Sequence, residues 1–280
     1  MLYFILRPFV RFIFKFFFKR LSINGLENIP KSGAIILASN HSNSFLDAAI
    51  IGCYLDRRMW SLGRGDVFKK KWAKKLLSSF FMLPVFRLSE GKEFMTGNDE
   101  TFKDCLDLFK KGEIVLIFSE GFSNHQTKLL PLKKGTARLS QMAWLDGIDL
   151  AIVPIMISYE DFFKFGKNTN YNIGKPIKKS DFEDVREDSF FLKIFNNLLE
   201  QKLTSLQNRT FTDVSFIQNP VYYISSVLFF PAHSFASFLS RKITKGSAFF
   251  DSIVLGLLIV IYPIYWGLLA WLIWFLYNIS

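Results

Sequence analysis

The sequence predicts an α/β fold with a mixed, mostly parallel sheet flanked by helices. Apolar runs at 34–38, 59–62, 114–118 and 150–157 have the length and composition of short buried strands. Helical patterns lie between these runs, and strands that alternate with helices usually form a substantially parallel sheet. The length of 280 residues suits one such domain with appended segments.

Three segments carry the pattern of amphipathic helices. Residues 99–111 place apolar side chains at helical spacing and precede Gly112, which is a suitable C-terminal cap. A second helix is predicted at 136–146. A third is predicted at 187–207, where apolar residues from Phe191 to Leu206 line one stripe.

Residues 1–20 predict an amphipathic helix at a membrane interface. Four cations recur every four residues and form one stripe, with Phe, Leu and Ile on the rest of the surface: Arg7, Arg11, Lys15 and Lys19. Such a helix directs cations toward lipid phosphates and aromatic rings toward acyl chains. The alternative is a helix packed on the protein's own core. A signal peptide is not indicated, because no uninterrupted apolar core and no small-residue cleavage site are present.

The C-terminal region 216–280 is predicted to associate with the membrane. Residues 252–277 carry no charge and form the predicted anchor. A straight helix of that length would reach roughly 39 Å, against a hydrocarbon core of about 30 Å. Tilt could absorb the excess, whereas Pro263 permits a kink or a shallow hairpin.

Residues 221–239 are interpreted as an interfacial or re-entrant segment. They are apolar and aromatic, but Pro231 and His233 interrupt them. If this segment crossed from the cytoplasm, the cations at 241, 242 and 245 would lie outside, against the positive-inside bias. The globular domain is therefore expected to occupy residues 21–215.

Composition favours a lipid surface as the partner. Half of the residues are hydrophobic, 33 are Phe, and the net charge is +11. This combination fits an anionic membrane better than nucleic acid, and no nucleic-acid-binding motif is present. No metal-binding Cys/His spacing occurs. The two cysteines, Cys53 and Cys105, suggest no disulfide framework and indicate a reducing, cytosolic side.

The stretch S-N-H-S-N-S-F-L-D (39–47) contains a candidate catalytic pair. His41 and Asp47 would point to different faces of one helix, so they can meet only if His41 precedes the helix that Asp47 begins. Ser44 and Asp47 also match a capping box, in which Asp47 serves only the helix start. If the pair is catalytic, His41 acts as a general base and Asp47 fixes its tautomer. No G-x-S-x-G serine is present, so the substrate supplies the nucleophile, as in direct acyl transfer to a hydroxyl.

A second polar stretch follows the predicted strand at 114–118. Glu120 stands where α/β folds place ligands, and Gly121 permits close approach of the backbone. Arg87 lies where another strand runs out and could hold a phosphate with a two-pronged contact.

In this combination, the residues of segment 22–178 resemble the glycerolipid acyltransferases, the family of lysophosphatidic acid and glycerol-3-phosphate acyltransferases. Four blocks occur in the family's order: Asn40-His41 with Asp47, Phe86-Arg87, Phe118-Ser119-Glu120-Gly121, and Val153-Pro154-Ile155. Smaller similarities occur at 24–30, 130–135 and 174–177. The resemblance implies the family's α/β fold and identifies residues 21–215 as an acyltransferase domain.

The resemblance also implies a mechanism without an acyl-enzyme. His41 would deprotonate a hydroxyl of lysophosphatidic acid or glycerol-3-phosphate, and Asp47 would orient His41. The oxygen would attack the thioester of acyl-CoA or of an acyl carrier protein, which are co-substrates, so no resident cofactor or metal is expected. The residues expected to bind substrate are Asn40, Arg64, Arg87, Ser119, Glu120 and Gly121.

Three departures from the family pattern bear on the acceptor. Five residues instead of four separate His41 from Asp47, which is similar to a branch that includes fungal glycerol-3-phosphate acyltransferases. Ser119 replaces a proline, and E-G-F-S (120–123) replaces E-G-T-R. The missing arginine leaves open an amino-acid-containing or other phosphate-free lyso-lipid as acceptor. Cations that could replace it are His125, Lys128, Lys133 and Lys134.

Five lysines between 69 and 75 surround Trp72. They form either a solvated helix face or a patch that presses on anionic lipid, the phosphates of CoA or an acidic carrier protein. The sequence thus predicts a membrane-bound O-acyltransferase of phospholipid biosynthesis with its active site on the cytoplasmic face. A non-catalytic membrane protein that binds lipid is the alternative of another class.

Overall fold

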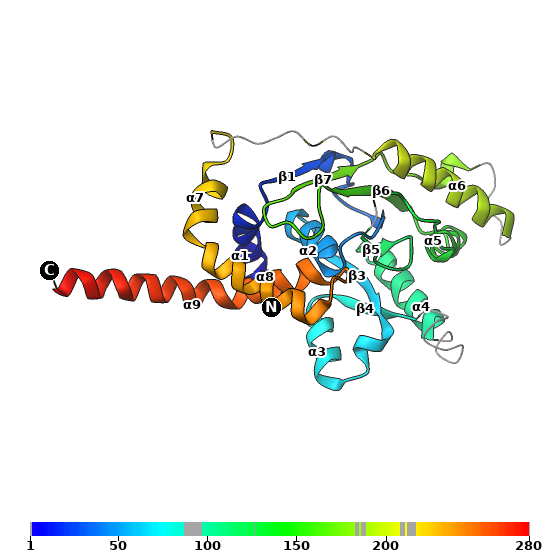
Figure 1. Ribbon diagram of the computed structural model, residues 1–280. Helices are drawn as coiled ribbons and strands as arrows, with labels where there is room; N and C mark the ends of the chain where they lie inside the picture. Colours follow the sequence, from blue (N-terminus) through cyan, green and yellow to red (C-terminus); the bar gives the residue numbers. More distant parts are fainter. Residues whose placement is uncertain are drawn as a thin grey trace.

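The computed structural model describes residues 2–86, 97–125, 127–182, 185, 189–207, 211 and 217–279. Within these ranges, one sheet of seven strands forms the centre of the protein (Figure 1). The strands are β1 (Arg20–Asn24), β2 (Ala34–Ser39), β3 (Met59–Arg64), β4 (Met82–Val85), β5 (Ile114–Phe118), β6 (Leu150–Tyr159) and β7 (Asn168–Ile173).

The sheet is mixed and mostly parallel, as the sequence predicts. Its order is β1-β7-β6-β2-β5-β3-β4, and every neighbouring pair is parallel except β6 with β7. Because β6, β2, β5 and β3 run the same way, their carboxyl ends share one edge of the sheet. Side chains that follow β2 and β5 therefore start from neighbouring points, with Ser39 paired to Phe118.

Helices lie on both sides of the sheet. They are α1 (Leu2–Phe17), α2 (Phe45–Tyr54), α3 (Lys71–Ser79), α4 (Gly97–Lys110), α5 (Gly135–Leu145), α6 (Ser189–Ser205), α7 (Pro220–Leu228), α8 (Phe230–Thr244) and α9 (Phe250–Ile279). Short 3-10 turns occur as η1 (Leu26–Asn28), η2 (Gly65–Phe68) and η5 (Lys179–Asp181). The predicted helices at 99–111, 136–146 and 187–207 correspond to α4, α5 and α6.

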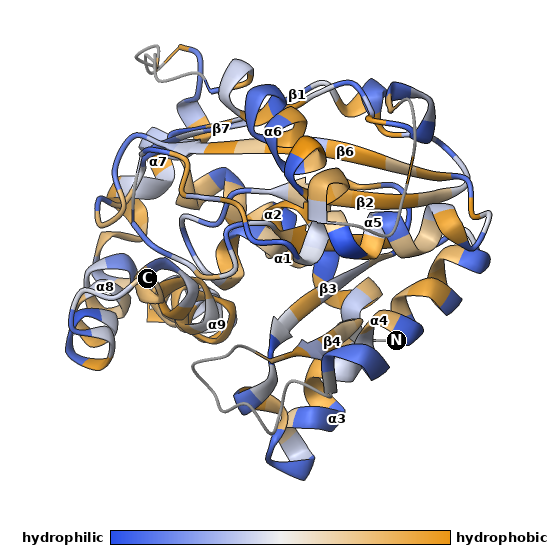
Figure 2. Ribbon diagram, turned by 90° about the vertical axis from the view of Figure 1, so that its right-hand side faces the viewer, coloured by the Kyte–Doolittle hydropathy of each residue, from blue (hydrophilic) through white to orange (hydrophobic). Residues whose placement is uncertain are grey.

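Two hydrophobic clusters pack against opposite faces of the sheet. In β2, Ile35 and Leu37 join the cluster with α1, α2, α8 and α9, whereas Ile36 and Ala38 join the cluster with α4, α5 and α6. This alternation follows from the two-residue period of a strand, and it requires apolar residues at every position of a strand covered on both faces. Figure 2 shows β2 and β6 as mainly hydrophobic ribbons among these helices.

Helix α1 packs on the core as well as presenting apolar residues to the surface. Ile13, Phe14 and Phe17 are buried, while Phe4, Ile5 and Phe12 are exposed. That the cationic stripe of α1 faces lipid phosphates stays a prediction, because Arg11 is exposed and Arg7 is half-buried. Arg7 donates from Nε to the carbonyl of Cys53 at 3.0 Å and from Nη2 to that of Leu55, and Arg11 stacks on the ring of Tyr54 at 4.8 Å. Arg7 thereby stabilises the C-terminus of α2, whose carbonyls carry partial negative charge.

Helix α9 divides into a buried and an exposed half. Its first turns place Val254, Leu255 and Leu258 in the same cluster as α2. From Pro263 onward most side chains are exposed, and the helix runs out beyond the body of the protein (Figure 1). Pro263 lies inside one continuous helix, so the hairpin considered from the sequence is wrong. In the described part of the chain, α9 is the one helix long and apolar enough to cross a membrane.

The segment interpreted as interfacial, residues 221–239, forms helix α7 and most of helix α8. Their exposed apolar side chains include Val227, Phe230, Phe235 and Phe238. Helix α8 packs against α9, and the C-terminal end of α7 meets α9 where the hydroxyl of Tyr265 donates to the carbonyl of Leu228 at 2.9 Å (Figure 1). A position at the bilayer surface stays a prediction for this segment.

Candidate active site

His41 stands in the loop that leaves β2 at the carboxyl edge of the sheet. The preceding residue, Asn40, fixes this exit, because its side chain bonds both backbone groups of Ile157 in β6, the amide at 2.8 Å and the carbonyl at 2.9 Å. Asn40 is buried and also donates to Ser42 at 3.2 Å. The loop therefore begins from a rigid, two-point attachment to the sheet.

The loop brings His41 and Asp47 together as the sequence predicts. Nδ1 of His41 lies 3.0 Å from Oδ2 of Asp47. Between them the chain bends through Ser44, whose φ of 50° is unusual for a residue other than glycine. The extra residue between His41 and Asp47 is thus accommodated by a bulged loop.

The capping-box expectation is only half right. Ser44 is the N-cap of α2 and Asp47 its third residue, but the Ser44 side chain makes no capping hydrogen bond. The Asp47 carboxylate instead accepts from the backbone N–H of Asn43 at 2.8 Å. Asp47 therefore braces the His41 loop from inside the first turn of the helix.

Asp47 is fully buried and receives three donors. Besides His41 and Asn43, the hydroxyl of Tyr159 donates to Oδ1 at 2.6 Å. Tyr159 lies at the end of β6, and its oxygen is 2.9 Å from that of Tyr171 in β7. Burial and the neighbouring Asp47 raise the pKa of Tyr159 well above its usual value, so the hydroxyl keeps its proton and remains a donor.

The imidazole of His41 is held by stacking as well as by Asp47. Its ring lies 3.7 Å from that of Phe118, at an angle of 11°. The side chain of His41 is 14% exposed, and within the described residues no hydrogen bond involves its Nε2. With Nδ1–H directed at a carboxylate, the lone pair of Nε2 is available to an incoming proton.

Glu120, two residues after the end of β5, supports the same loop. Its Oε2 accepts the backbone N–H of His41 at 2.7 Å, and its Oε1 accepts that of Leu130 at 2.8 Å. Burial raises the pKa of Glu120, and the two N–H donors oppose that shift. Gly121 follows with a φ of 76°, where a β-carbon would lie 2.9 Å from the Lys133 side chain.

The segment after Gly121 closes over the His41 loop. Ser123 accepts the backbone N–H of Ser44 at 2.8 Å, and Asn124 donates its own to the carbonyl of His41 at 3.1 Å. His125 stacks on Phe162 with ring centres 4.5 Å apart. Burial and Lys167 lower the pKa of His125, so at neutral pH this residue is a poor substitute for the missing arginine cation.

The predicted substrate-binding residues fall into two groups. Asn40, Ser119 and Glu120 are buried beside His41 and bonded within the protein, with Ser119 Oγ 3.0 Å from Thr136 Oγ1. Arg64 is exposed at the end of β3 and forms an ion pair with Asp66 at 2.5 Å. Arg87 lies outside the described residues. As contacts to substrate, all of these residues and Gly121 stay predictions.

Four residues of the site were missed by sequence reasoning. Asn43 and Tyr159 contact Asp47, and Lys167 and Asp251 form a buried ion pair that reaches Asn43. Tyr159 could have been found from the sequence, because it ends the strand that contains the Val153-Pro154 block. Asp251 stands 204 positions after Asp47, and no local pattern links the two.

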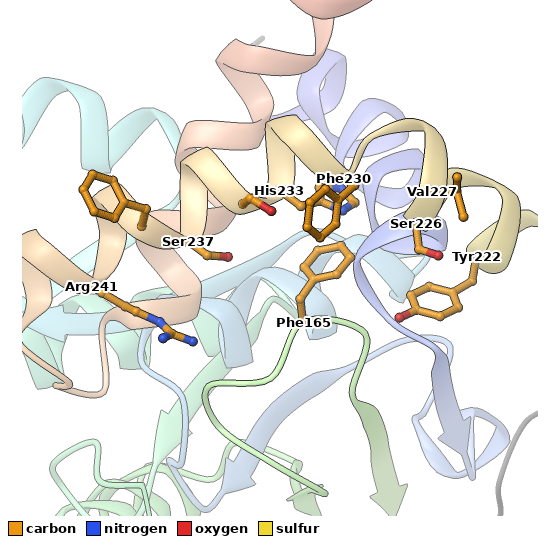
Figure 3. A pocket seen from close by; sticks show the side chains of 10 residues that line it. Phe165, Tyr222, Ser226, Val227, Phe230, His233, Ser237 and Arg241 are labelled. Atoms are coloured by element: carbon orange, nitrogen blue, oxygen red, sulfur yellow. The ribbon is translucent and has the colours of Figure 1, made fainter.

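One pocket lies apart from His41. It has a volume of about 810 Å³ and is bordered by α7, α8 and the loop before β7 (Figure 3). Aromatic side chains such as Phe165 and Phe230 line it, with Arg241 at one end. No cluster of three or more potential metal ligands occurs within the ranges that the structure describes.

Comparison with known proteins identifies one family. A family model described as "Acyltransferase" matches residues 20–158. A 1-acyl-sn-glycerol-3-phosphate acyltransferase of Bacillus subtilis is 27% identical over 188 residues, which cover 65% of this chain and 86% of that protein. The chloroplastic 1-acyl-sn-glycerol-3-phosphate acyltransferase LPAT1 of Arabidopsis thaliana is 28% identical over 151 residues, or 50% of this chain and 36% of that protein.

The fold has a counterpart among crystal structures. The 1-acyl-sn-glycerophosphate acyltransferase PlsC of Thermotoga maritima aligns with a TM-score of 0.54 over 75% of this chain and 81% of that chain. The sequence identity is 18%, so this likeness concerns the fold. The Lys167–Asp251 pair lies outside the segment that the family model matches.

Proposed function

Because this chain belongs to the glycerolipid acyltransferase family, we propose that it is a membrane-bound O-acyltransferase of phospholipid biosynthesis. It transfers a fatty acyl group from acyl-CoA or acyl-ACP to a hydroxyl of lysophosphatidic acid or glycerol-3-phosphate. The observation that carries this proposal is the 3.0 Å contact between Nδ1 of His41 and the buried Asp47 carboxylate.

The chemistry requires one base. Nε2 of His41 takes the proton of the acceptor hydroxyl while its oxygen attacks the carbonyl carbon of the thioester. Asp47 holds the Nδ1–H tautomer and stabilises the imidazolium that forms. When the tetrahedral intermediate collapses, the C–S bond breaks and the sulfur leaves with the proton from His41. The products are an ester and a free thiol.

The acceptor is proposed to reach His41 from the bilayer surface. Helix α9 would anchor the chain, while the exposed apolar residues of α1, α7 and α8 would lie at the interface on the cytoplasmic side. The acyl chains then stay in hydrocarbon and the headgroup meets the site. Arg64 and Arg87 are candidates to bind its phosphate, with Asn40, Ser119, Glu120 and Gly121 shaping the site around it.

A phosphate-free acceptor is the second candidate. The stretch E-G-F-S (120–123) lacks the arginine of the family pattern, and Arg64 is already paired with Asp66. An amino-acid-containing lyso-lipid or a simple alcohol would need fewer cations. The substrates are distinguished by an acceptor panel, in which turnover of phosphate-free acceptors alone would exclude lysophosphatidic acid and glycerol-3-phosphate.

The mechanism is tested by His41→Ala in the purified full chain, assayed with acyl-CoA or acyl-ACP and each acceptor. We expect kcat to fall by about 10²–10⁴-fold, the usual contribution of a positioned base. His233→Ala is the matched control, because His233 lies in α8, outside the proposed site. Retained turnover of a folded His41→Ala protein would overturn the mechanism.

A further inference from the structure

We propose that the buried Asp251, whose charge Lys167 neutralises, positions the catalytic loop through Asn43, which makes the start of α9 part of the support of the active site. The inference rests on the proposed function of His41 and Asp47. It assigns to α9 a role besides anchoring, because residues at its start contact the loop that carries His41.

Two side chains at the start of α9 bond to this loop. Asp251 accepts from Nδ2 of Asn43 at 2.5 Å, and Ser252 accepts the backbone N–H of Leu46 through its hydroxyl at 3.2 Å. The backbone N–H of Asn43 in turn donates to Asp47 at 2.8 Å. Asn43 thus joins Asp251 on one side to the carboxylate that orients His41 on the other.

Lys167 completes the arrangement from the segment that precedes β7. Its Nζ lies 2.5 Å from Oδ2 of Asp251, and its side chain has no exposed surface. Burial lowers the pKa of Lys167, and the charge of Asp251 opposes that shift. Taking both charges out of water is costly, so an apolar pair of similar volume would serve stability equally well or better. The pair is therefore better explained by the oxygen of Asp251 that accepts from Asn43, with Lys167 as its counter-charge.

Apolar packing alone would leave the position of α9 loosely defined. Val254, Leu255 and Leu258 contact the core by shape and without directional bonds. The polar contacts of Asp251 and Ser252 are directional, and they act on the turn between Asn43 and Leu46. A displacement of this turn would carry Asp47 away from His41, and small misplacements of a catalytic group lower turnover strongly.

A matched pair of double variants separates positioning from folding. Lys167→Met with Asp251→Asn removes both charges but keeps a side-chain oxygen that can accept from Asn43. Lys167→Met with Asp251→Leu removes the charges and the acceptor. We expect the second protein to lose about ten- to a hundredfold in kcat relative to the first, with KM for both substrates within about threefold. Equal kcat in two folded proteins would overturn the proposal.

A single substitution tests the same link if a double variant does not fold. Asn43→Ala leaves the ion pair intact and removes the bond between Asp251 and the loop, so a kcat loss of similar size is expected. The control is Trp144→Phe, which deletes a buried hydrogen bond of 2.9 Å from α5 to the carbonyl of Leu150 and lies on the other face of the sheet from the loop. We expect lower thermal stability and unchanged kcat per folded molecule. Wild-type kcat in Asn43→Ala would refute the link.

A spectroscopic readout keeps this inference distinct from the proposed function. Nitrogen chemical shifts of ¹⁵N-labelled His41 report how far its Nδ1–H is held by Asp47, without any substrate. We expect the Asp251→Leu double variant to lose the wild-type shift and the Asp251→Asn double variant to retain it. If His41→Ala keeps its turnover, the proposed function fails, whereas unchanged shifts in both double variants refute the positioning role alone.

Discussion

The catalytic loop and the edge formed by β3, η2 and α3 are built in opposite ways, although both follow parallel strands at the same end of the sheet. In the loop, Asn40, Asn43 and Asp47 are buried and bonded to several elements. At the edge, Arg64 is exposed and paired with a residue two positions away, and α3 has no buried residue. Trp72 in α3 is 67% exposed.

This difference separates two tasks of an acyltransferase. A general base must be held to within a fraction of an ångström, so its supports are numerous, short and buried. A surface that meets a lipid headgroup, CoA or a carrier protein gains from charge and can tolerate movement, because long-range attraction needs no fixed geometry. The comparison predicts that substitutions in the loop act mainly on kcat and those at the edge mainly on KM.

The largest effect is expected from Asp47→Asn. The amide would turn one of the two acceptor oxygens into a donor, opposite N–H and O–H groups that already donate. We expect kcat to fall by about 10²–10⁴-fold. Asp47 would no longer hold the Nδ1–H tautomer of His41, and the imidazolium that forms would lack a counter-charge. Steady-state kinetics measures the loss. A change confined to KM would contradict the division between loop and edge.

A smaller effect is expected from Tyr159→Phe, which deletes one of the donors to Asp47. We expect roughly tenfold lower kcat and a loss of roughly 1–3 kcal/mol in unfolding free energy, since a buried carboxylate oxygen loses its partner. Because burial raises the pKa of Tyr159, the wild-type pH profile of kcat should show no break from this group below about pH 10. Tyr171→Phe, one bond further from Asp47, should lower kcat less. Equal losses of kcat in the two variants would show that Tyr159 does not act through its hydrogen bond to Asp47.

The sequence predicted those parts of the fold that local patterns encode. The four apolar strands and three amphipathic helices were found because two-residue and 3.6-residue periods report burial directly. Strands β1 and β7 were missed, since R-L-S-I-N (20–24) and N-T-N-Y-N-I (168–173) are short and rich in polar residues. Their pairing with each other and with β6 is a property of the whole sheet.

The site divides in the same way. The contact between His41 and Asp47 could be predicted, because the two residues are only six positions apart and a short loop before the helix can bring them together. Lys167 and Asp251 could not, because each looks like an ordinary charge in its own segment. Their meeting depends on how α9 packs against α8 and α2, and that packing is a long-range property. The bond from Arg7 to the end of α2 was missed for a related reason, since spacing reveals a cationic face but not what the face contacts.

A weaker effect is expected from Arg64→Ala at the edge. The guanidinium is exposed and already paired with Asp66, and exposed ion pairs contribute little. We expect acceptor KM to rise by less than about tenfold, which matches at most one phosphate contact of roughly 1 kcal/mol, with kcat unchanged. The control is Arg58→Ala, which deletes a similar pair with Glu113 near the opposite end of β3 and should leave both constants unaltered. A fall in kcat as large as that of Asp47→Asn would place Arg64 with the loop.

The smallest effect is expected from Ser44→Gly inside the loop. Ser44 has a φ of 50° and a ψ of −134°, a backbone conformation that costs a side-chain-bearing residue about 1–3 kcal/mol. Its hydroxyl makes no capping bond, so glycine removes the strain at the cost of roughly 0.5–1 kcal/mol of added chain entropy when unfolded. We expect about 1 kcal/mol of net stabilisation, a rise in Tm of about 2–4 °C, and kcat within about twofold. Ser42→Gly, which deletes an acceptor of Asn40 at an ordinary φ, should instead lower Tm. If Ser44→Gly lowers kcat by tenfold or more, the strained turn itself holds His41 in place, and the loop is rigid through its backbone as well as through its buried bonds.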